Sequence, residues 1–465
     1  MVGIVRWNVY FPRCFLTGEA LGAAWNQPPS KLSKRVANFD EDSLTMAAQA
    51  ALGLEGTKAD AVFFASTTSP YREKLCASII APVLGISSGV RTADFANSLR
   101  CGTGALLSAR DSVVCGSVSS AIVTAADCRF AEPGSPEEIT LGDGSAAIIV
   151  GKENIAAEIL SSHSITSELL HIWRKSSDSY IKTGDVRFSE QYGYVESIAS
   201  CVDSLFRKAG VSARDISKAI IPLPEIRPIK AVCERLGLDM KSQWFDPLTG
   251  FTGFTGAAHP FILLASALEN SKPGEKILLT SYGDGCDAIL LQTTENVLRL
   301  GAAQRAKKAL ARRKEIASYA KFLDYRNILG RWDWSPNAFG STIMEHRQSG
   351  EFLGLNALKC RKCGLILSLS LPVCPSCRAE KEFDKVKLSR RGKIFTYTQE
   401  HYYPTPEPPV TMAVVDLDGG GRILLQMTDC DWREVKIGME VELVFRKMHE
   451  AGGFHNYYWK AIPAA

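Results

Sequence analysis

Hydrophobic and polar positions along the first 297 residues alternate between two patterns. Short apolar runs of strand type are followed by longer Ala-rich or amphipathic runs of helical type, which is typical of a sheet covered by helices. The strand-like runs include residues 61–65, 120–125, 146–150, 218–221, 276–280 and 288–291. The helix-like runs include residues 42–52, 104–114, 195–209 and 260–270. This region therefore predicts an α/β fold.

An internal duplication is visible in the same region. Residues 142–144 and residues 283–285 both read Gly-Asp-Gly, and each triplet follows a strand and leads into another. Upstream of each triplet lies a small-residue turn that opens a helix, at 101–104 in the first copy and at 253–260 in the second. Chance recurrence of such turns is the alternative, but the matching surroundings favour two similar halves. The predicted halves span 1–152 and 153–297.

Beyond residue 297 the composition changes. Residues 298–350 are rich in Arg, Lys and Ala, and we interpret them as a helical connector whose basic run is a solvated helix face rather than a nucleic-acid patch. Residues 383–465 hold short strands rich in β-branched and aromatic residues between Pro-rich and Gly-rich turns, which predicts a small OB-type barrel. Aromatic residues such as Tyr402 and Trp459 could stack on nucleic-acid bases or fill the barrel. The acidic runs of this module favour the second interpretation.

Four cysteines, Cys360, Cys363, Cys374 and Cys377, form two Cys-x-x-Cys pairs that are separated by ten residues. Each pair can form a tight turn, and together the pairs can build the tetrahedral four-sulfur site that zinc prefers. Four protein ligands leave no position for water, so we expect a structural zinc ion in a ribbon over residues 351–382. Iron or a chance pairing of cysteines are the alternatives.

Net charge and cysteine content indicate which partners and which cellular compartment to expect. The net charge of +4 over 465 residues gives no bulk argument for a nucleic-acid or membrane partner. No segment has the length and apolar character of a membrane span, and the N-terminal residues do not have the pattern of a signal peptide. The 13 cysteines are an odd number and most are scattered singly, so we expect a reducing, cytoplasmic setting rather than a disulfide framework.

Cys101 is the candidate nucleophile. Residues 97–105 place it at the expected start of a helix, where backbone N–H groups and the helix dipole favour a thiolate. Gly102 and Gly104 leave room beside the sulfur. A cysteine in this position can accept an acyl group from a thioester while a nearby N–H receives the oxyanion. The alternative is an inert buried cysteine.

The duplicated body, Cys101 at a helix start, the two Gly-Asp-Gly turns and the segment 272–283 together resemble the thiolase superfamily. The resemblance is closest to the archaeal and bacterial 3-hydroxy-3-methylglutaryl-CoA (HMG-CoA) synthase branch; it covers residues 1–297 and continues at 318–323. The C-terminal part is similar to the zinc-ribbon plus OB-fold domain that accompanies such enzymes. The resemblance implies a duplicated, five-layered αβαβα fold, usually dimeric, and acyl-CoA thioesters as substrates.

Three positions depart from the residues that the HMG-CoA synthase branch uses beside its cysteine. Thr67 stands where the family has Glu, Pro222 where it has His, and Phe254 where it has Asn. The resemblance to this branch assigns Phe254, together with Gly283 and Gly285, to the loops that would face the substrate and its oxyanion.

Two residues are candidates for the missing acid and base. His259, in Gly-Ala-Ala-His-Pro, resembles the Gly-His-Pro histidine of thiolases and could take the proton of Cys101, or it could serve only as a turn residue at a helix start. Glu225 is the nearest carboxylate in the segment that lacks the family's His.

Two functions follow from the resemblance. The first is an acyl-CoA-dependent enzyme of the acyltransferase type that forms or cleaves a carbon–carbon bond, by Claisen-type condensation or thiolysis, through an acyl-Cys101 intermediate. The second is a catalytically degenerate CoA-binding scaffold that partners an active thiolase or synthase. In both cases we expect a homodimer or a complex with a thiolase-type subunit. Nucleic-acid binding through the zinc and OB module is a third hypothesis, which we do not favour.

Overall fold

A computed structural model describes residues 1–54, 56, 58–331 and 338–464. The chain divides into two compact units, of which the first comprises residues 1–38, 42–80 and 89–322. The second unit comprises residues 39–41, 81–88 and 323–465. The division falls inside the connector predicted over residues 298–350. Residues 332–337 of that connector lie outside the described residues, as does residue 465 of the predicted OB region.

The first unit is built on a nine-stranded sheet in the order β11-β12-β13-β8-β1-β7-β6-β4-β5. Its strands are β1 (Gly3–Tyr10), β4 (Ala61–Ala65), β5 (Arg91–Phe95), β6 (Ser120–Asp127), β7 (Gly144–Gly151), β8 (Ala157–Thr166), β11 (Lys218–Ile220), β12 (Lys276–Tyr282) and β13 (Gly285–Thr293). The pairs β6–β7 and β12–β13 are antiparallel, whereas β4–β6 and β11–β12 are parallel. The two halves of the sheet therefore repeat one arrangement, and each Gly-Asp-Gly triplet leads into the corresponding strand, β7 or β13.

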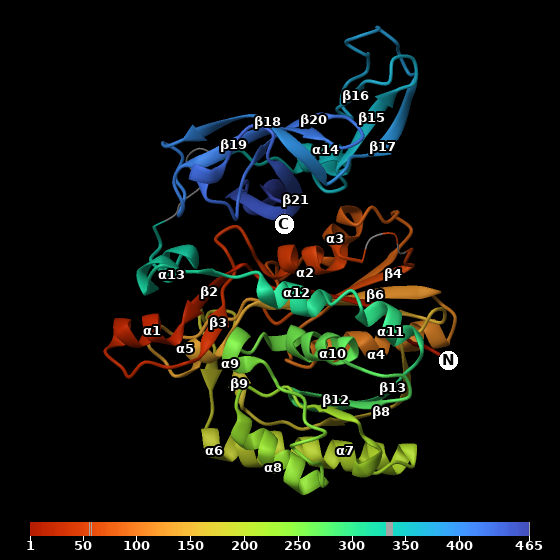
Figure 1. The fold of residues 1–465 in the computed structure, drawn as a ribbon, viewed down its shortest axis with the longest axis vertical. Helices are drawn as coiled ribbons and strands as arrows, with labels where there is room; N and C mark the ends of the chain where they lie inside the picture. Colours follow the sequence, from red (N-terminus) through yellow and green to blue (C-terminus); the bar gives the residue numbers. More distant parts are fainter. Residues whose placement is uncertain (55, 57, 332–337, 465) are drawn as a thin grey trace. The chain divides into compact units, whose positions relative to one another are not determined.

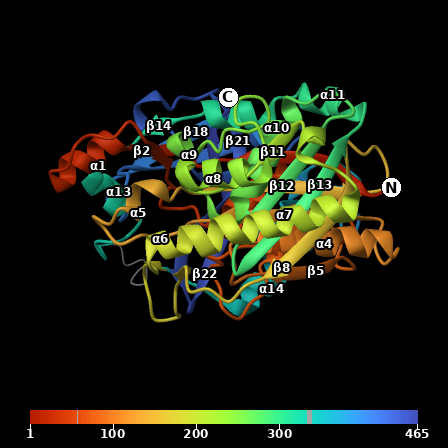
Figure 2. The same cartoon turned by 90° about the horizontal axis from the view of Figure 1, so that it is seen from below.

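Helices and strands of the first unit are stacked in five layers (Figure 1). Helices α4 (Cys101–Val114) and α10 (His259–Glu269) lie between a layer with β4 and β6 and a layer with β8, β12 and β13. Helix α2 (Ser43–Leu52) covers the outer side of the layer with β4 and β6. Helices α7 (Glu196–Ala209) and α8 (Ile226–Leu236) cover the outer side of the layer with β8, β12 and β13. Figure 2 shows α7 running across β8, β12 and β13. The predicted αβαβα fold is confirmed.

The sequence of each helix matches its layer. Helix α10 is buried over His259–Leu268, because a helix between two layers has no face left for solvent. Helix α7 buries an apolar stripe at Ile198, Val202 and Leu205 and exposes its other face, as expected for an outer helix.

The second unit contains two β structures. A small sheet has the order β16-β15-β17, and a five-stranded antiparallel sheet has the order β20-β19-β18-β21-β22. The strands of these sheets are β15 (Asn356–Cys360), β16 (Ile366–Leu367), β17 (Phe383–Lys387), β18 (Arg391–Glu400), β19 (Val410–Leu417), β20 (Arg422–Gln426), β21 (Glu440–Ala451) and β22 (Phe454–Pro463). Met427, just after β20, bridges Ala461 of β22, so the two edges of the larger sheet meet and close a barrel.

The burial of aromatic side chains decides whether they fill the barrel or are free to stack on nucleic-acid bases. Trp459 and Phe445 are fully buried and Tyr457 nearly so, so these rings fill the barrel. Tyr402, by contrast, is 97% exposed.

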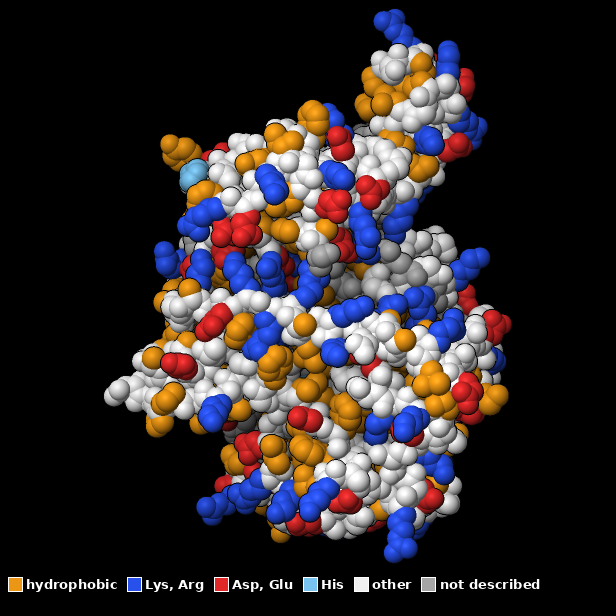
Figure 3. All heavy atoms as spheres, viewed as in Figure 1, with side chains coloured by type: hydrophobic (Ala, Val, Ile, Leu, Met, Phe, Trp, Pro, Cys, Tyr) orange, Lys and Arg blue, Asp and Glu red, His pale blue; other side chains and the backbone are white. Residues whose placement is uncertain are grey.

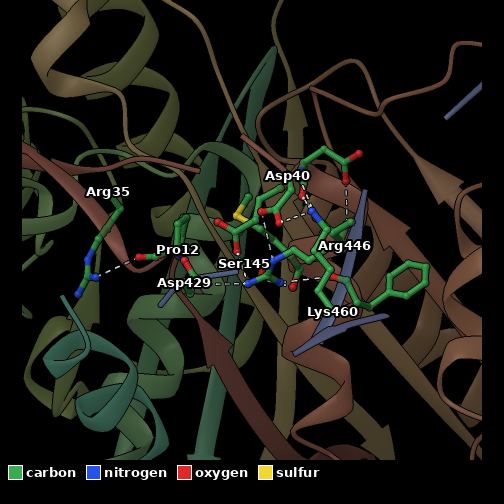
Figure 4. Close-up of polar contacts among 12 residues, drawn as sticks. Pro12, Arg35, Asp40, Ser145, Asp429, Arg446 and Lys460 are labelled. Carbon is green, nitrogen blue, oxygen red and sulfur yellow. Dashed lines mark hydrogen bonds and ion pairs between the residues drawn. The ribbon is translucent and has the colours of Figure 1, made fainter. Parts of the chain in front are cut away.

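A buried ion network lies within the second unit (Figure 4). Arg446 of β21, 1% exposed, pairs through Nη2 with Glu41 at 3.0 Å and with Asp429 at 3.1 Å. Lys460 of β22 pairs through Nζ with Asp40 at 2.9 Å. The segment Phe39–Glu41 is therefore held by the barrel strands, and removing one partner would leave buried charge without compensation.

None of the described helices has the length and apolar character needed to cross a membrane. On the face seen in Figure 3, basic and acidic side chains are interspersed over each unit. This agrees with the small net charge of +4.

Candidate active site around Cys101

Cys101 is the first residue of α4, as the sequence predicted. It is 6% exposed and belongs to the apolar core of the first unit, together with Ala125 of β6 and Ala257. Arg100, the residue before it, makes no side-chain capping hydrogen bond to the helix. The Cys101 N–H donates to the Ser98 carbonyl at 3.0 Å, and the backbone of Gly102 acts on the sulfur.

The surroundings of Cys101 keep its sulfur protonated. Burial raises the pKa of the Cys101 thiol well above its ordinary value of 9.0, and the negative charge of Asp127 raises it further. Backbone groups of Gly102, Cys101 and Ser66 act in the opposite direction but do not offset the burial. The prediction that the helix start yields a thiolate is therefore wrong for this closed arrangement, because burial outweighs the helix N-terminus.

Asp127, at the end of β6, ties three segments together beside Cys101. Its Oδ1 accepts three hydrogen bonds, from Ser66 Oγ (3.0 Å), the Thr67 N–H (2.7 Å) and Thr68 Oγ1 (2.9 Å). Its Oδ2 accepts from the Ala257 N–H at 2.8 Å, and a Cβ atom on Gly256 would lie 2.2 Å from the same oxygen. Asp127 is not among the site residues predicted from the sequence, where its signal is a single carboxylate at the carboxyl end of an apolar strand.

His259 is fully buried and both of its ring nitrogens are engaged within its own loop. Nδ1 accepts from the Thr255 N–H at 3.3 Å and lies 3.0 Å from Thr255 Oγ1. Nε2 therefore carries the proton and donates to the Pro247 carbonyl at 2.8 Å. Burial lowers the pKa of His259 to about 4. In this arrangement His259 is a neutral turn residue and offers no nitrogen to Cys101, which corrects its expected role as a base.

Glu225 and Phe254 also differ from their expected roles. Glu225 is exposed at the residue before α8, and a solvated carboxylate at that position does not form part of the buried surroundings of Cys101. Phe254 is 7% exposed and its ring packs against His259 with centroids 4.8 Å apart. It fills, with an apolar ring, the place that the family resemblance gives to an amide side chain.

The loop Gly283–Gly285 from the second half meets the residues that lead into α4. Ser98 Oγ donates to the Gly283 carbonyl at 3.1 Å. A Cβ atom on Gly283 would lie 2.6 Å from Ser98 Oγ and 2.9 Å from the Arg100 nitrogen, so only glycine permits this approach. Gly285 has φ +112° and a Cβ there would meet the Ile165 carbonyl oxygen at 2.1 Å. Its requirement for glycine is set by β8 rather than by Cys101.

Asp287 of β13 completes the contact between the halves. The Asp287 side chain is 5% exposed and accepts from Arg100 Nη1 at 3.0 Å and from Thr103 Oγ1 at 2.7 Å. These two residues flank Cys101 in the sequence. A carboxylate of the second half thus fixes the position of the nucleophile that the first half supplies.

A cavity of about 670 Å³ adjoins this site. Its wall includes residues 96–99, which lead into α4, Ser66 and Thr67 after β4, and Gly283 and Asp284 of the second half. Cys101 itself is not one of the residues that line the cavity, but Ser66 does line it, and the backbone of Ser66 acts on the pKa of Cys101. The volume is in the range of small-molecule sites.

The charged side chains on the cavity wall are mainly basic. They are Arg72, Arg129, Arg174 and Lys175 against Asp178 and Asp284. Arg72, Arg174 and Lys175 are exposed, whereas Arg129 is 6% exposed. Burial and the charge of Arg129 lower the pKa of His171 on the same wall to about 4, so His171 is neutral. The cavity therefore suits an anionic ligand.

The four predicted metal ligands come together in the second unit. The thiol sulfurs of Cys360, Cys363, Cys374 and Cys377 all lie within 4.8 Å of one another, and two of the pairs are 3.5 Å apart. Tetrahedral zinc with Zn–S bonds of about 2.3 Å would place its sulfurs roughly 3.8 Å apart. The cluster therefore fits a metal ion with four sulfur ligands.

Two family profiles match parts of the chain. Residues 206–292 match the profile described as 3-oxoacyl-[acyl-carrier-protein] synthase III, C terminal. Residues 385–446 match the profile described as ChsH2, C-terminal OB-fold domain. The first match lies in the second half of the duplicated body, and the second match covers most of the barrel.

Known proteins extend this similarity over most of the chain. The hydroxymethylglutaryl-CoA synthase of Caldivirga maquilingensis is 27% identical over 343 residues, which are 70% of this chain and 98% of that protein. A crystal structure of HMG-CoA synthase complexed with CoA is similar with a TM-score of 0.63 and 21% identity, covering 70% of this chain and 90% of that one. The HMG synthase of the curacin biosynthetic pathway, in complex with acetyl donor-ACP, gives a TM-score of 0.61 and 20% identity over 69% of this chain and 88% of that one.

These likenesses confirm the resemblance read from the sequence. The first unit has the thiolase-like fold of the HMG-CoA synthases, and the chain continues into an OB-fold domain of the ChsH2 type.

Proposed function

We propose that the protein is a CoA-dependent acyltransferase of the thiolase superfamily that loads an acyl group on Cys101 and forms or cleaves a carbon–carbon bond from it. The similarity to HMG-CoA synthases supports the class of reaction. One observation carries the assignment of Cys101. The cysteine starts a central helix that both halves hold in place, beside a basic cavity of about 670 Å³.

The loading step exchanges one thioester for another. The Cys101 sulfur attacks the thioester carbonyl, a sulfur–carbon bond forms, and the bond between the acyl carbon and the CoA sulfur breaks. The proton of the Cys101 thiol ends on the CoA sulfur, so the step needs no net acid or base. The backbone N–H of Gly102, at the start of α4, is the donor we propose for the carbonyl oxygen as it gains negative charge.

The raised pKa of Cys101 lowers the fraction of thiolate that is available for this step. Only the thiolate attacks, and a thiol whose pKa is raised by burial holds little thiolate at neutral pH. A bound thioester that brings new hydrogen-bond donors or displaces the charge of Asp127 would lower that pKa. We therefore propose that loading is slow in the free enzyme and depends on substrate binding.

Intact-protein mass spectrometry tests the proposal. The full chain is incubated with a panel of acyl-CoA thioesters, and one of them should add its acyl mass to the wild type but not to Cys101→Ser. Cys115→Ser, an exposed cysteine on the C-terminal side of α4, is the matched control and should acquire the mass as the wild type does. Absence of acylation across linear, branched and dicarboxylic thioesters would refute the enzymatic role.

A second function, a degenerate CoA-binding scaffold for an active thiolase or synthase, is favoured by the state of His259 and Phe254. Both ring nitrogens of His259 are engaged, and Phe254 supplies no polar group. This function predicts that the chain binds CoA and an active thiolase-type subunit but never forms an acyl-Cys101 adduct. We propose a homodimer or such a complex as the working state in either case.

We also propose that the cluster of Cys360, Cys363, Cys374 and Cys377 holds zinc with a structural role. All four positions of a tetrahedral ion would be filled by protein sulfur, which leaves none for water or substrate. Elemental analysis of the purified chain should give one zinc per protein.

A further inference from the structure

Two polar atoms on the wall of the cavity beside Cys101 have no protein partner. Arg129 Nη1 and Thr67 Oγ1 are both buried and make no hydrogen bond to any described residue. Buried donors are nearly always paired, and leaving a guanidinium nitrogen unpaired is costly. Two such atoms on one cavity wall indicate a ligand group that pairs with them.

Arg129 is linked electrostatically to the surroundings of Cys101. It follows Asp127 by two residues, and the charge of Asp127 acts on both Arg129 and Cys101. Thr67 is tied to the same place, because its N–H donates to Asp127 Oδ1 at 2.7 Å. Arg174 belongs to the same place, because its Nη2 donates to the Thr67 carbonyl at 3.1 Å and its charge acts on Arg129, but unlike Arg129 it is exposed to solvent.

Asp127 cannot satisfy Arg129 in place of a ligand. Its two oxygens already accept the hydrogen bonds of Ser66, Thr67, Thr68 and Ala257. No ion pair joins Arg129 to Asp127 among the described contacts, although the two charges act on each other. A cation that is buried, close to a saturated carboxylate and open to a cavity is complementary to a further anion.

We infer that the acyl group accepted by this cavity carries a carboxylate, which Arg129 binds with the help of the Thr67 hydroxyl. The substrate would be the CoA thioester of a dicarboxylic or similarly anionic acyl group. This inference rests on the proposed function, because it names the substrate class of the same site. The phosphate groups of CoA are the other source of negative charge, and the exposed Arg72 and Lys175 are the side chains suited to them.

Binding experiments with Cys101→Ser protein test the inference without requiring acylation. Succinyl-CoA and butyryl-CoA have the same chain length and differ in one terminal carboxylate, and titration calorimetry should give at least a tenfold lower Kd for succinyl-CoA. Adding Arg129→Met should bring the two Kd values within about twofold of each other. Adding Lys175→Met, which removes an exposed cation of the same cavity, should weaken both thioesters and free CoA alike and preserve their ratio.

Each result decides between the two sources of negative charge. Equal Kd values for the two thioesters in the Arg129-containing protein would overturn the inference. So would an Arg129→Met variant that weakens free CoA as much as succinyl-CoA, because Arg129 would then bind phosphate. Thr67→Val, which replaces the hydroxyl by a methyl group, should reduce the succinyl preference in part and keeps the test valid if Arg129→Met does not fold.

The same data separate this inference from the proposed function. A succinyl preference that depends on Arg129, together with no acyl-Cys101 adduct in the wild type, would keep the inference and refute the enzymatic role. Acylation of the wild type at equal rates by both thioesters would support the enzymatic role and refute the inference.

Discussion

Replacing Asp127 by Asn should make the first unit less stable and Cys101 more acidic. The substitution keeps the size of the side chain but removes its charge and turns one oxygen into a donor. Asp127 accepts three hydrogen bonds at Oδ1 and one, from the Ala257 N–H, at Oδ2. An amide can keep an oxygen toward only one of these two sets.

The loss can be worked out from those contacts. In the better orientation the amide oxygen keeps the three donors at the Oδ1 position, and its NH2 group meets the Ala257 N–H, donor against donor. Hydrogen bonds to charged groups contribute roughly 1.5–3 kcal/mol, and a buried unpaired donor costs about 1–3 kcal/mol. We expect the free energy of unfolding of the first unit to fall by about 2–4 kcal/mol.

The same substitution should make Cys101 more reactive, although it makes the first unit less stable. The charge of Asp127 is the second cause, after burial, of the raised pKa of the Cys101 thiol. Removing that charge should lower the pKa, so the rate of alkylation of Cys101 by iodoacetamide should reach half of its maximum at a lower pH. Peptide mapping by mass spectrometry reports this rate at each pH for Cys101 alone.

Asp94→Asn is the matched control. Asp94 on β5 accepts from the Cys76 and Ala77 N–H groups at 2.6 and 2.9 Å, and its charge is not one of the main contributions to the raised pKa of Cys101. This variant should lose stability without moving the pH dependence of Cys101. A faster alkylation of Asp127→Asn at every pH, with an unchanged midpoint, would mean that the variant only loosens the site, and the electrostatic reasoning would be refuted.

Three further predictions concern the wild type and the second unit. The rate of Cys101 alkylation in the wild type should rise about tenfold per pH unit up to at least pH 9, because the thiol pKa lies above 9.0; a plateau near pH 7 would contradict this. Cys374→Ser should release zinc, measured by elemental analysis, and lower the unfolding temperature of the second unit, whereas Cys430→Ser, outside the cluster, should retain the metal. Arg446→Met should cost about 3–5 kcal/mol in denaturant unfolding because it leaves buried carboxylates uncompensated, whereas Arg422→Met, which removes an exposed ion pair, should cost less than about 1 kcal/mol.

Much of the fold follows from local pattern. The strand over residues 61–65 and the helix over 195–209 have nearly the bounds that periodicity predicts, and α4 begins where the Gly-rich segment at Cys101 suggested. The duplicated Gly-Asp-Gly triplets indicated the repeat because each one must turn the chain from one buried strand into the next. Each of these signals is contained in a short stretch of sequence.

The polar groups around Cys101 could not be predicted in the same way. Asp127 meets Thr67 and Ala257, which are 60 and 130 positions away in the sequence, and no local pattern specifies that meeting. His259 resembles a catalytic residue by its neighbours, but its role is decided by the Pro247 carbonyl, which accepts from its Nε2. Arg129 gave no signal, because its unpaired nitrogen is apparent only when the cavity wall is assembled.

The two copies of the Gly-Asp-Gly triplet have different roles in the two halves of the first unit. Asp143 in the first copy is 3% exposed and accepts from the Ala37 N–H at 2.7 Å, so it serves the fold. Asp284 in the second copy has φ +50° and lines the cavity. Three residues later, Asp287 holds Arg100 and Thr103 on both sides of Cys101. The nucleophile therefore comes from the first half but is positioned by the second, so residues 1–152 alone should not hold Cys101 in a reactive position.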